Sequence, residues 1–257
     1  MAIPSRVEER LAAAERVRLF LDYDGTLADF APTPEHADPD SEVVDLLTRL
    51  VGHPRFRVAV ISGRRLSHVE KLVPVKGALL AGIYGVELRL PGGERVDRAP
   101  YESVRPLLEV IKPQWAALID GSEGFFLEDK GWALALHARF AEEDEAEDVL
   151  VAARSVVDGV PSNLFRVLGG HRFLEIGPRL AHKGRTVDYL LARYPWPGAL
   201  PVYLGDDDKD EEAFGVIKAH GGVAILVSRG PRETQADGRL ESPHAARRWL
   251  EMCLLHS

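Results

Sequence analysis

The sequence predicts a Rossmann-like α/β fold, in which a parallel-sheet core is interrupted by a small inserted α+β domain. In residues 17–90, short apolar runs alternate with amphipathic helical patterns, the order of strand–helix–strand units. Between residues 101 and 179 the order changes to helix, two strands, helix, two strands. The strand–helix alternation then resumes. We therefore expect residues 1–100 and 180–257 to form the core and residues 101–179 to form the insert.

The core elements follow from apolar runs and the residues that flank them. We expect Ser5 to cap a first helix, because Glu8 follows three residues later. Prolines between residues 30 and 40 predict a loop. The expected strands are 17–22, 56–61, 78–81, 202–204 and 223–227, with a hairpin over 86–90 and 94–98; the expected helices are 5–16, one from 41, 66–73, 182–194 and 243–255.

The insert reads as an antiparallel sheet with its helices on one face. A helix over residues 102–119 should be interrupted or kinked at Pro106 and Pro113. We expect the later hairpin to turn at Gly169-Gly170. The remaining expected elements are strands 125–130 and 132–139, a helix over 142–157, and strands 165–168 and 172–176.

The composition of the 257-residue chain is ordinary for a globular protein, with 46% hydrophobic and 28% charged residues. The net charge of −8 and the absence of a basic stripe argue against nucleic-acid binding, and no apolar stretch approaches transmembrane length. No signal-peptide core follows Met1, so we expect a cytoplasmic protein, without membrane partners, that is a monomer or a weak oligomer. The single cysteine, Cys253, excludes an intramolecular disulfide and should be a packing residue.

An apolar run in residues 19–27 ends in two carboxylates, a glycine and a threonine. Because side chains two apart in a strand point the same way, Asp22 and Asp24 should face one site at the carboxyl end of the sheet. A capped turn is one alternative for these residue types. A calcium loop fails, since Leu27 and Thr33 stand where Gly and Glu are needed. A third interpretation, which stands beside the capped turn, is a nucleophilic Asp22 with an acid/base Asp24.

Other strand ends and one helix start also carry polar residues. These residues are Ser62, Gly63 and Arg64 after the second strand, Lys183 after the insert, and Asp206, Asp207 and Asp210 after strand 202–204. Taken singly, Ser62 would be a helix N-cap, Lys183 a solvated first-turn residue and residues 206–212 an acidic helix start. The carboxyl ends of parallel strands share one edge, so together they predict one site.

Phosphoryl transfer accounts for this set of residue types. Asp22 would attack phosphorus and form an aspartyl-phosphate, while Asp24 would protonate the departing alkoxide and then activate water. Ser62 and Lys183 would bind phosphoryl oxygens. Because carboxylate and phosphate repel each other, a divalent cation is needed, and Mg²⁺ suits oxygen ligands. The expected metal ligands are Asp22, the main-chain carbonyl of Asp24, and Asp206. Asp210 would orient a ligand or a metal-bound water.

The motifs, in this order, resemble those of the haloacid dehalogenase-like superfamily along the whole chain, and within it those of the trehalose-6-phosphate phosphatases. The residues that carry the resemblance are 21–27, 61–64, 85–89, Glu128-Asp129-Lys130 with His137, Glu175-Ile176, Lys183-Gly184 and 205–207. The resemblance implies Mg²⁺-dependent hydrolysis of a small sugar phosphate, trehalose 6-phosphate, with the insert as a cap domain. It further implies substrate-binding roles for Thr26, Gly63, Arg64, Glu87, Lys130 and Glu175. A surface ion pair is the alternative for Lys130 and Glu175.

Four positions depart from the family pattern: Tyr84 replaces His, Gly177 replaces Arg, His182 replaces Asn, and Lys209 replaces Thr. Tyr84 and Gly177 should lie near the sugar pocket. A phosphatase for a different phosphorylated glycoside therefore stays open, such as a sucrose phosphate, a glycosyl-3-phosphoglycerate or a pseudo-disaccharide phosphate. The sequence also leaves open a non-catalytic sugar-phosphate-binding module and a phosphomutase.

Overall fold

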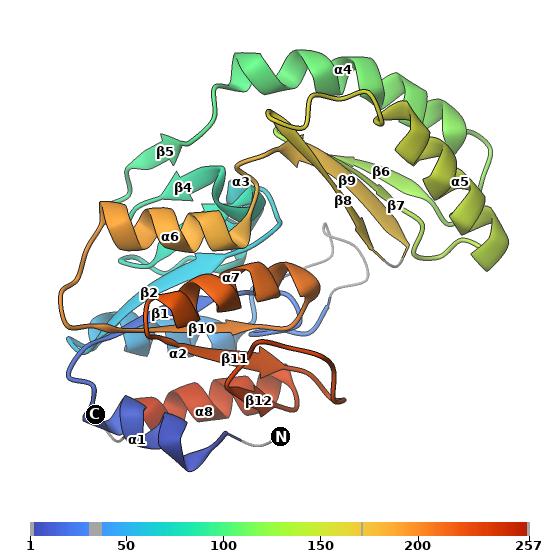
Figure 1. Ribbon diagram of the computed structural model, residues 1–257. Helices are drawn as coiled ribbons and strands as arrows, with labels where there is room; N and C mark the ends of the chain where they lie inside the picture. Colours follow the sequence, from blue (N-terminus) through green and yellow to red (C-terminus); the bar gives the residue numbers. More distant parts are fainter. Residues whose placement is uncertain (1–2, 31–37, 171, 256–257) are drawn as a thin grey trace. The chain divides into compact units, whose positions relative to one another are not determined.

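The computed structural model describes residues 3–30, 38–170 and 172–255 (Figure 1). The chain forms two compact units, Met1–Val96 with His182–Ser257, and Asp97–Ala181. Most of the loop expected between residues 30 and 40 lies outside the described residues. Among the described helices, none combines the length and the apolar character that crossing a membrane requires.

The first unit is built on an eight-stranded sheet, and the predicted Rossmann-like core is confirmed. The strands from β12 to β3 run parallel, and β4 pairs antiparallel with β3. The sheet order is β12 (Gly238–Leu240), β11 (Val223–Val227), β10 (Leu200–Gly205), β1 (Val17–Leu21), β2 (Phe56–Ile61), β3 (Leu79–Gly82), β4 (Glu87–Arg89) and β5 (Arg95–Asp97). β12 was not predicted, because its three residues carry no apolar run.

Helices cover both faces of this sheet (Figure 1). Successive strand residues point to opposite faces. Leu19 and Leu21 accordingly join one apolar cluster, while Phe20 joins the other together with Tyr203. Burial on both sides explains why β1 reads as a continuous apolar run. The first cluster includes α1 (Ser5–Ala13), α2 (Ser41–Gly52), α3 (Leu66–Leu72) and α8 (Pro243–Leu255), and the second includes α6 (Lys183–Arg193) and α7 (Asp208–Ala219).

The start of α1 differs from the prediction. Ser5 is the first helical residue, and Pro4 occupies the cap position without a side-chain cap hydrogen bond. The proline ring fixes an extended approach to the helix, so the helix begins one residue beyond it. At α2, the Asp40 side chain accepts hydrogen bonds from the N–H groups of Glu42 and Val43.

The second unit contains a four-stranded antiparallel sheet and two long helices. The sheet order is β6 (Phe126–Asp129), β7 (Leu134–His137), β9 (Phe173–Pro178) and β8 (Phe165–Gly170), and the helices are α4 (Tyr101–Leu118) and α5 (Glu143–Val156). α4 continues through Pro106 and Pro113, so an interruption at these prolines is wrong, while a kink there stays a prediction. Its buried apolar face offsets the two missing backbone donors. Gly169 and Gly170 pair with β9 as strand residues, so the expected turn at these glycines is also wrong.

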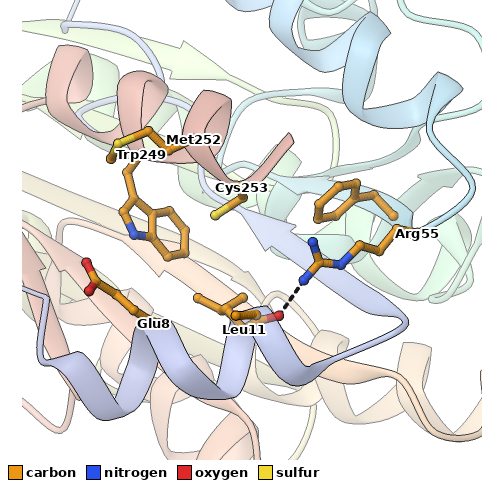
Figure 2. A pocket seen from close by; sticks show the side chains of 8 residues that line it. Glu8, Leu11, Arg55, Trp249, Met252 and Cys253 are labelled. Atoms are coloured by element: carbon orange, nitrogen blue, oxygen red, sulfur yellow. Dashed lines mark hydrogen bonds between the residues drawn. The ribbon is translucent and has the colours of Figure 1, made fainter. Parts of the chain in front are cut away.

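The helices α1 and α8 border a cavity of about 300 Å³ in the first unit (Figure 2). Trp249 and Cys253 line it from α8, and Leu11 lines it from α1. The partly buried Cys253 packs against the apolar core, as predicted. Burial raises the pKa of its thiol to about 12, so the reactive thiolate is not favoured at neutral pH.

Candidate active site

The carboxyl ends of β1, β2 and β10 lie side by side, because their registers align. Leu21 is opposite Val60 of β2 and Leu204 of β10. The next residue, Asp22, donates its backbone N–H to the Leu204 carbonyl at 3.0 Å. Its side chain is buried, with 5% of the residue exposed. The chain therefore places a buried carboxylate at the centre of this edge.

Lys183 contacts both Asp22 and Asp210. Its Nζ donates to Asp22 Oδ1 at 2.7 Å and to Asp210 Oδ1 at 2.6 Å. Burial lowers the pKa of Lys183, but the attraction of Asp210 and Asp22 outweighs it, and the pKa rises well above its ordinary value. The first residue of α6 thus supplies a fixed positive charge to the edge.

Asp210 is fully buried and accepts four hydrogen bonds. Its Oδ1 accepts from Lys183 and from the Tyr203 hydroxyl at 2.7 Å. Its Oδ2 accepts from the backbone N–H groups of Asp206 at 3.0 Å and Asp207 at 3.1 Å. With both oxygens occupied, this carboxylate fixes the loop that precedes α7 and orients Lys183.

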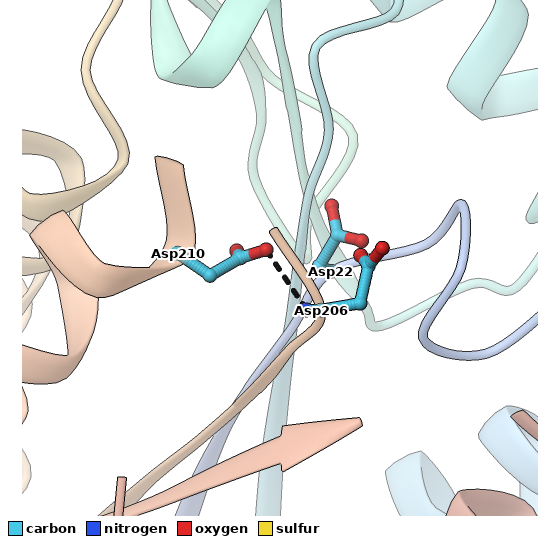
Figure 3. A group of neighbouring side chains, drawn as sticks. All are labelled: Asp22, Asp206 and Asp210. Carbon is cyan, nitrogen blue, oxygen red and sulfur yellow. Dashed lines mark hydrogen bonds between the residues drawn. The ribbon is translucent and has the colours of Figure 1, made fainter. Parts of the chain in front are cut away.

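The carboxylates of Asp22, Asp206 and Asp210 form a group that could hold a metal ion (Figure 3). One ligand atom from each lies within 4.8 Å of the others. Burial raises the pKa of Asp22 and of Asp210 to about 8 and that of Asp206 to about 7, and mutual repulsion adds to the shift. Three carboxylates against the single ammonium of Lys183 leave an excess of negative charge, which a divalent cation would neutralise. The donor set fits a hard cation.

Three contacts fix Asp206 within this group. Its N–H donates to Asp210, as described above, and its Oδ1 accepts from Thr26 Oγ1 at 3.2 Å. Its carbonyl accepts from Arg232 Nη1 at 3.0 Å, and Arg232 also pairs with Asp208. Gly25 (φ +83°) lies against the same carboxylate, since a Cβ there would clash with Asp206 Oδ2.

Asp24 and Ser62 both contact Arg64. The Arg64 guanidinium binds both oxygens of Asp24, and its backbone N–H donates to Ser62 Oγ at 3.1 Å. Gly63 lies between these residues, and a Cβ on it would be 2.7 Å from the ring of Tyr84. The Tyr84 ring therefore occupies the space that a side chain at position 63 would need.

Comparison with known proteins identifies the family. The model of the trehalose-phosphatase family matches residues 20–244. The chain belongs to the trehalose-phosphatase family. It is therefore a phosphatase, a phosphoric monoester hydrolase, as predicted.

Two relatives illustrate the range of trehalose phosphatases that it resembles. It is 31% identical to trehalose 6-phosphate phosphatase RA3 of Zea mays, over 96% of this chain and 72% of that protein. It is 35% identical to a trehalose-phosphate phosphatase of Mycobacterium avium, over 93% of this chain and 62% of that protein. The fold matches the C-terminal domain of Candida albicans trehalose-6-phosphate phosphatase with a TM-score of 0.85, at 22% identity over 97% and 96% of the two chains. The predicted haloacid dehalogenase-like fold is confirmed.

In this trehalose-phosphatase family member, Lys130 and Glu175 lie in the second unit and form a buried ion pair. Lys130 Nζ donates to Glu175 Oε2 at 2.6 Å, and the two residues are 7% and 2% exposed. The ion pair of the alternative interpretation is therefore present, but it is buried and does not lie at the surface. Glu128 Oε2 lies 3.9 Å from the same Nζ and 3.0 Å from His137 Nε2, and His137 stacks on Phe126. The sheet of the second unit thus carries a connected group of polar side chains, formed by Glu175, Lys130, Glu128 and His137.

Glu87 has a structural contact in the first unit. Its Oε2 accepts the Leu66 N–H at 3.0 Å, at the first residue of α3. Two of the positions that depart from the family pattern lie at helix starts: His182 Nδ1 accepts the Arg185 N–H at the start of α6, and Lys209 pairs with Asp207 at the start of α7. A Cβ at Gly177 would lie 3.1 Å from that of Ala133. Ala133 thus leaves little room for a side chain at position 177.

Two residues of the trehalose-phosphatase site were missed by sequence reasoning. Tyr203 could have been noticed, because a hydroxyl in a buried strand needs a partner, and here that partner is Asp210. Arg232 lies between β11 and β12 without any periodic or motif signal, and its contact with Asp206 depends on the tertiary structure.

Proposed function

We propose that the protein hydrolyses trehalose 6-phosphate to trehalose and inorganic phosphate, with Mg²⁺ as the cofactor. The observation that carries the proposal is the placement of Asp22, buried at the end of β1 and held by Lys183 beside Asp206. The family membership supplies the substrate class. The substrate is a sugar phosphate, and no nucleic-acid or membrane partner enters the reaction.

Asp22 is the proposed nucleophile. Lys183 holds its Oδ1, which leaves the second carboxylate oxygen to attack phosphorus and form an aspartyl-phosphate. A bound Mg²⁺ would neutralise charge on the phosphoryl oxygens. Asp22, Asp206 and the main-chain carbonyl of Asp24 would hold the ion. Asp210 would orient one of these ligands or a metal-bound water.

Asp24 is the proposed acid and base. It would protonate the departing sugar alkoxide and then take a proton from the water that attacks the aspartyl-phosphate. Arg64 fixes the orientation of its carboxylate. Ser62 and Lys183 would bind phosphoryl oxygens. Thr26 reaches Asp206 with its hydroxyl, which supports a role in positioning that carboxylate.

Sugar recognition is proposed for Glu87, Lys130 and Glu175. The buried Lys130–Glu175 pair supports this role, because buried charges aligned by mutual contact are suited to bind several hydroxyls. Glu87 retains one carboxylate oxygen beyond the one that contacts Leu66. Gly63 and Arg64 would border the phosphate.

The test is phosphate release from trehalose 6-phosphate with Mg²⁺, using Asp22→Asn as the near-isosteric control. The comparison panel contains sucrose 6-phosphate, a glucosyl-3-phosphoglycerate, a pseudo-disaccharide phosphate and an aryl phosphate. We expect strong preference for trehalose 6-phosphate, lost in the variant and with a chelator. Preference for a different glycoside phosphate would contradict the proposed substrate but agree with the proposed mechanism. If no phosphate is released from any of the compounds, the protein would be a binding module. Interconversion of phosphosugars without net phosphate release would indicate a mutase.

A further inference from the structure

Another cavity of the first unit lies at the opposite edge of the sheet. Its volume is about 460 Å³, and it lies at the starts of β1, β2 and β3. Arg18 and Arg57 provide its charged groups, and its apolar wall includes Leu79, Leu90 and Tyr194. Arg18 precedes Asp22 by four residues of extended chain, about 13 Å. The cavity is therefore separate from the carboxylate cluster.

The two arginines face each other directly. Arg18 of β1 is in register with Arg57 of β2, so their side chains leave the same face of neighbouring strands. Arg18 is only 6% exposed, and burial, together with the charge of Arg57, lowers its pKa to about 10. Like charges in direct opposition destabilise a sheet unless an anion lies close by.

Backbone carbonyls at the C-terminal end of α6 accept hydrogen bonds from Arg18. Arg18 donates to the carbonyls of Tyr194 at 2.7 Å and Leu190 at 2.8 Å, at the end of α6. A guanidinium has five N–H donors, so donors remain beyond these two bonds. In the described ranges, neither Arg18 nor Arg57 forms an ion pair with a carboxylate. The C-terminal carbonyls of α6 explain why Arg18 is tolerated, but not why a second arginine stands opposite it.

Arg57 is exposed, so a ligand can reach it. Its guanidinium stacks on an aromatic ring. The guanidinium lies 4.3 Å from the centre of the Trp196 ring. Arg16 lies 6.0 Å from the same ring. Three arginines therefore gather at this edge in a chain of net charge −8. A cluster of this kind attracts anions in an otherwise acidic protein.

We propose that this cavity binds a small organic anion, with its carboxylate or phosphoryl oxygens between Arg18 and Arg57 and its apolar part against Leu79, Leu90 and Tyr194. Guanidinium groups match planar carboxylates and phosphoryl groups through paired hydrogen bonds. A mainly apolar wall with a few converging polar groups is the usual form of a small-molecule site, and the volume lies in the usual range. The proposal does not depend on the substrate proposed above.

The probes are benzoate and phenylphosphonate, which share one ring and differ in the anionic group. Binding is measured by calorimetry on the full chain, and by Trp196 fluorescence, which an anion that draws Arg57 from the ring would change. We expect one molecule per chain, at least about tenfold weaker binding in Arg57→Gln, and unchanged binding in Arg248→Gln. Arg248 is the matched control, since it is an exposed arginine of α8 that does not line the cavity.

The stronger of the two probes identifies the anionic group. If Arg57→Gln leaves phenylphosphonate binding unchanged, this probe binds at the catalytic edge of the sheet. Benzoate binding alone would then measure occupation of this cavity. The proposal is overturned if neither probe binds wild type and Arg248→Gln at millimolar concentration with an affinity that Arg57→Gln weakens. It is equally overturned if Arg57→Gln and Arg248→Gln weaken both probes by the same factor. Because Arg57 is exposed, its substitution leaves the core intact and the comparison remains interpretable.

Discussion

Arg64 holds the Asp24 carboxylate through two hydrogen bonds, from Nε to Oδ2 at 2.7 Å and from Nη2 to Oδ1 at 2.6 Å. The two side chains are 12% and 20% exposed, so solvent competes little for this contact. A forked guanidinium fixes both the position and the plane of a carboxylate, which one point charge does not. Arg64 therefore determines where the proposed acid/base group points.

Arg64→Lys should lower kcat by about tenfold or more, because a lysine retains the charge but not the paired geometry. Steady-state kinetics on wild type, Arg64→Lys and Arg64→Gln would measure this loss. A similar kcat in all three folded proteins would show that the orientation of Asp24 does not limit the reaction.

Arg232→Gln should raise the Mg²⁺ concentration needed for half-maximal binding by about tenfold, because Arg232 holds the carbonyl of Asp206. Calorimetric Mg²⁺ titration measures this directly, without relying on activity. The matched control is Arg229→Gln, an exposed arginine in the same segment. Equal Mg²⁺ affinity in both variants would contradict a positioning role for Arg232.

Lys130→Met should destabilise the protein by about 3–5 kcal/mol, because it leaves the buried Glu175 carboxylate unpaired. Glu175→Met should cost less, since Glu128 remains 3.9 Å from the Lys130 ammonium. Denaturant unfolding of both single variants and the double variant tests this. We expect the double variant to lose less than the sum of the singles, and simple additivity would show that the pair is not coupled.

The pairing of Asp129 with Arg105 should make the stability of the second unit depend on pH. Arg105 donates to both Asp129 oxygens at 2.7 and 2.8 Å, and Lys112 donates at 2.9 Å. The hydrogen bonds from Arg105, and then that from Lys112, hold the pKa of Asp129 well below its usual range, even though burial opposes them. A carboxyl whose folded-state pKa is lowered adds stability above its unfolded pKa of about 4 and loses it as the pH falls toward the folded value.

Asp129→Asn should therefore reduce the free energy of unfolding at pH 7, and the difference from wild type should shrink below about pH 4. Urea unfolding at several pH values measures it, with the exposed Asp120→Asn as the matched control. A difference that stays constant down to pH 3 would contradict the assigned cause.

Much of the site could be predicted because strand order and local pattern are readable from sequence. The apolar run of β1 ends at Leu21 because both faces of that strand are buried, and the next residue, Asp22, must then lie at the sheet edge. The same reasoning placed Ser62, Lys183 and Asp206 near that edge, because parallel strands share it. These inferences rely on short-range periodicity, which the sequence records directly.

The tertiary structure alone decided which of these side chains touch and how deeply they are buried. Lys183 and Asp22 are 161 residues apart, so no local pattern could show that one ammonium joins Asp22 and Asp210. The Arg232 contact with Asp206 and the burial of Lys130 likewise depend on packing between distant segments. Periodicity specifies which face of an element is apolar, whereas desolvation and ion pairing depend on what the fold brings against that face.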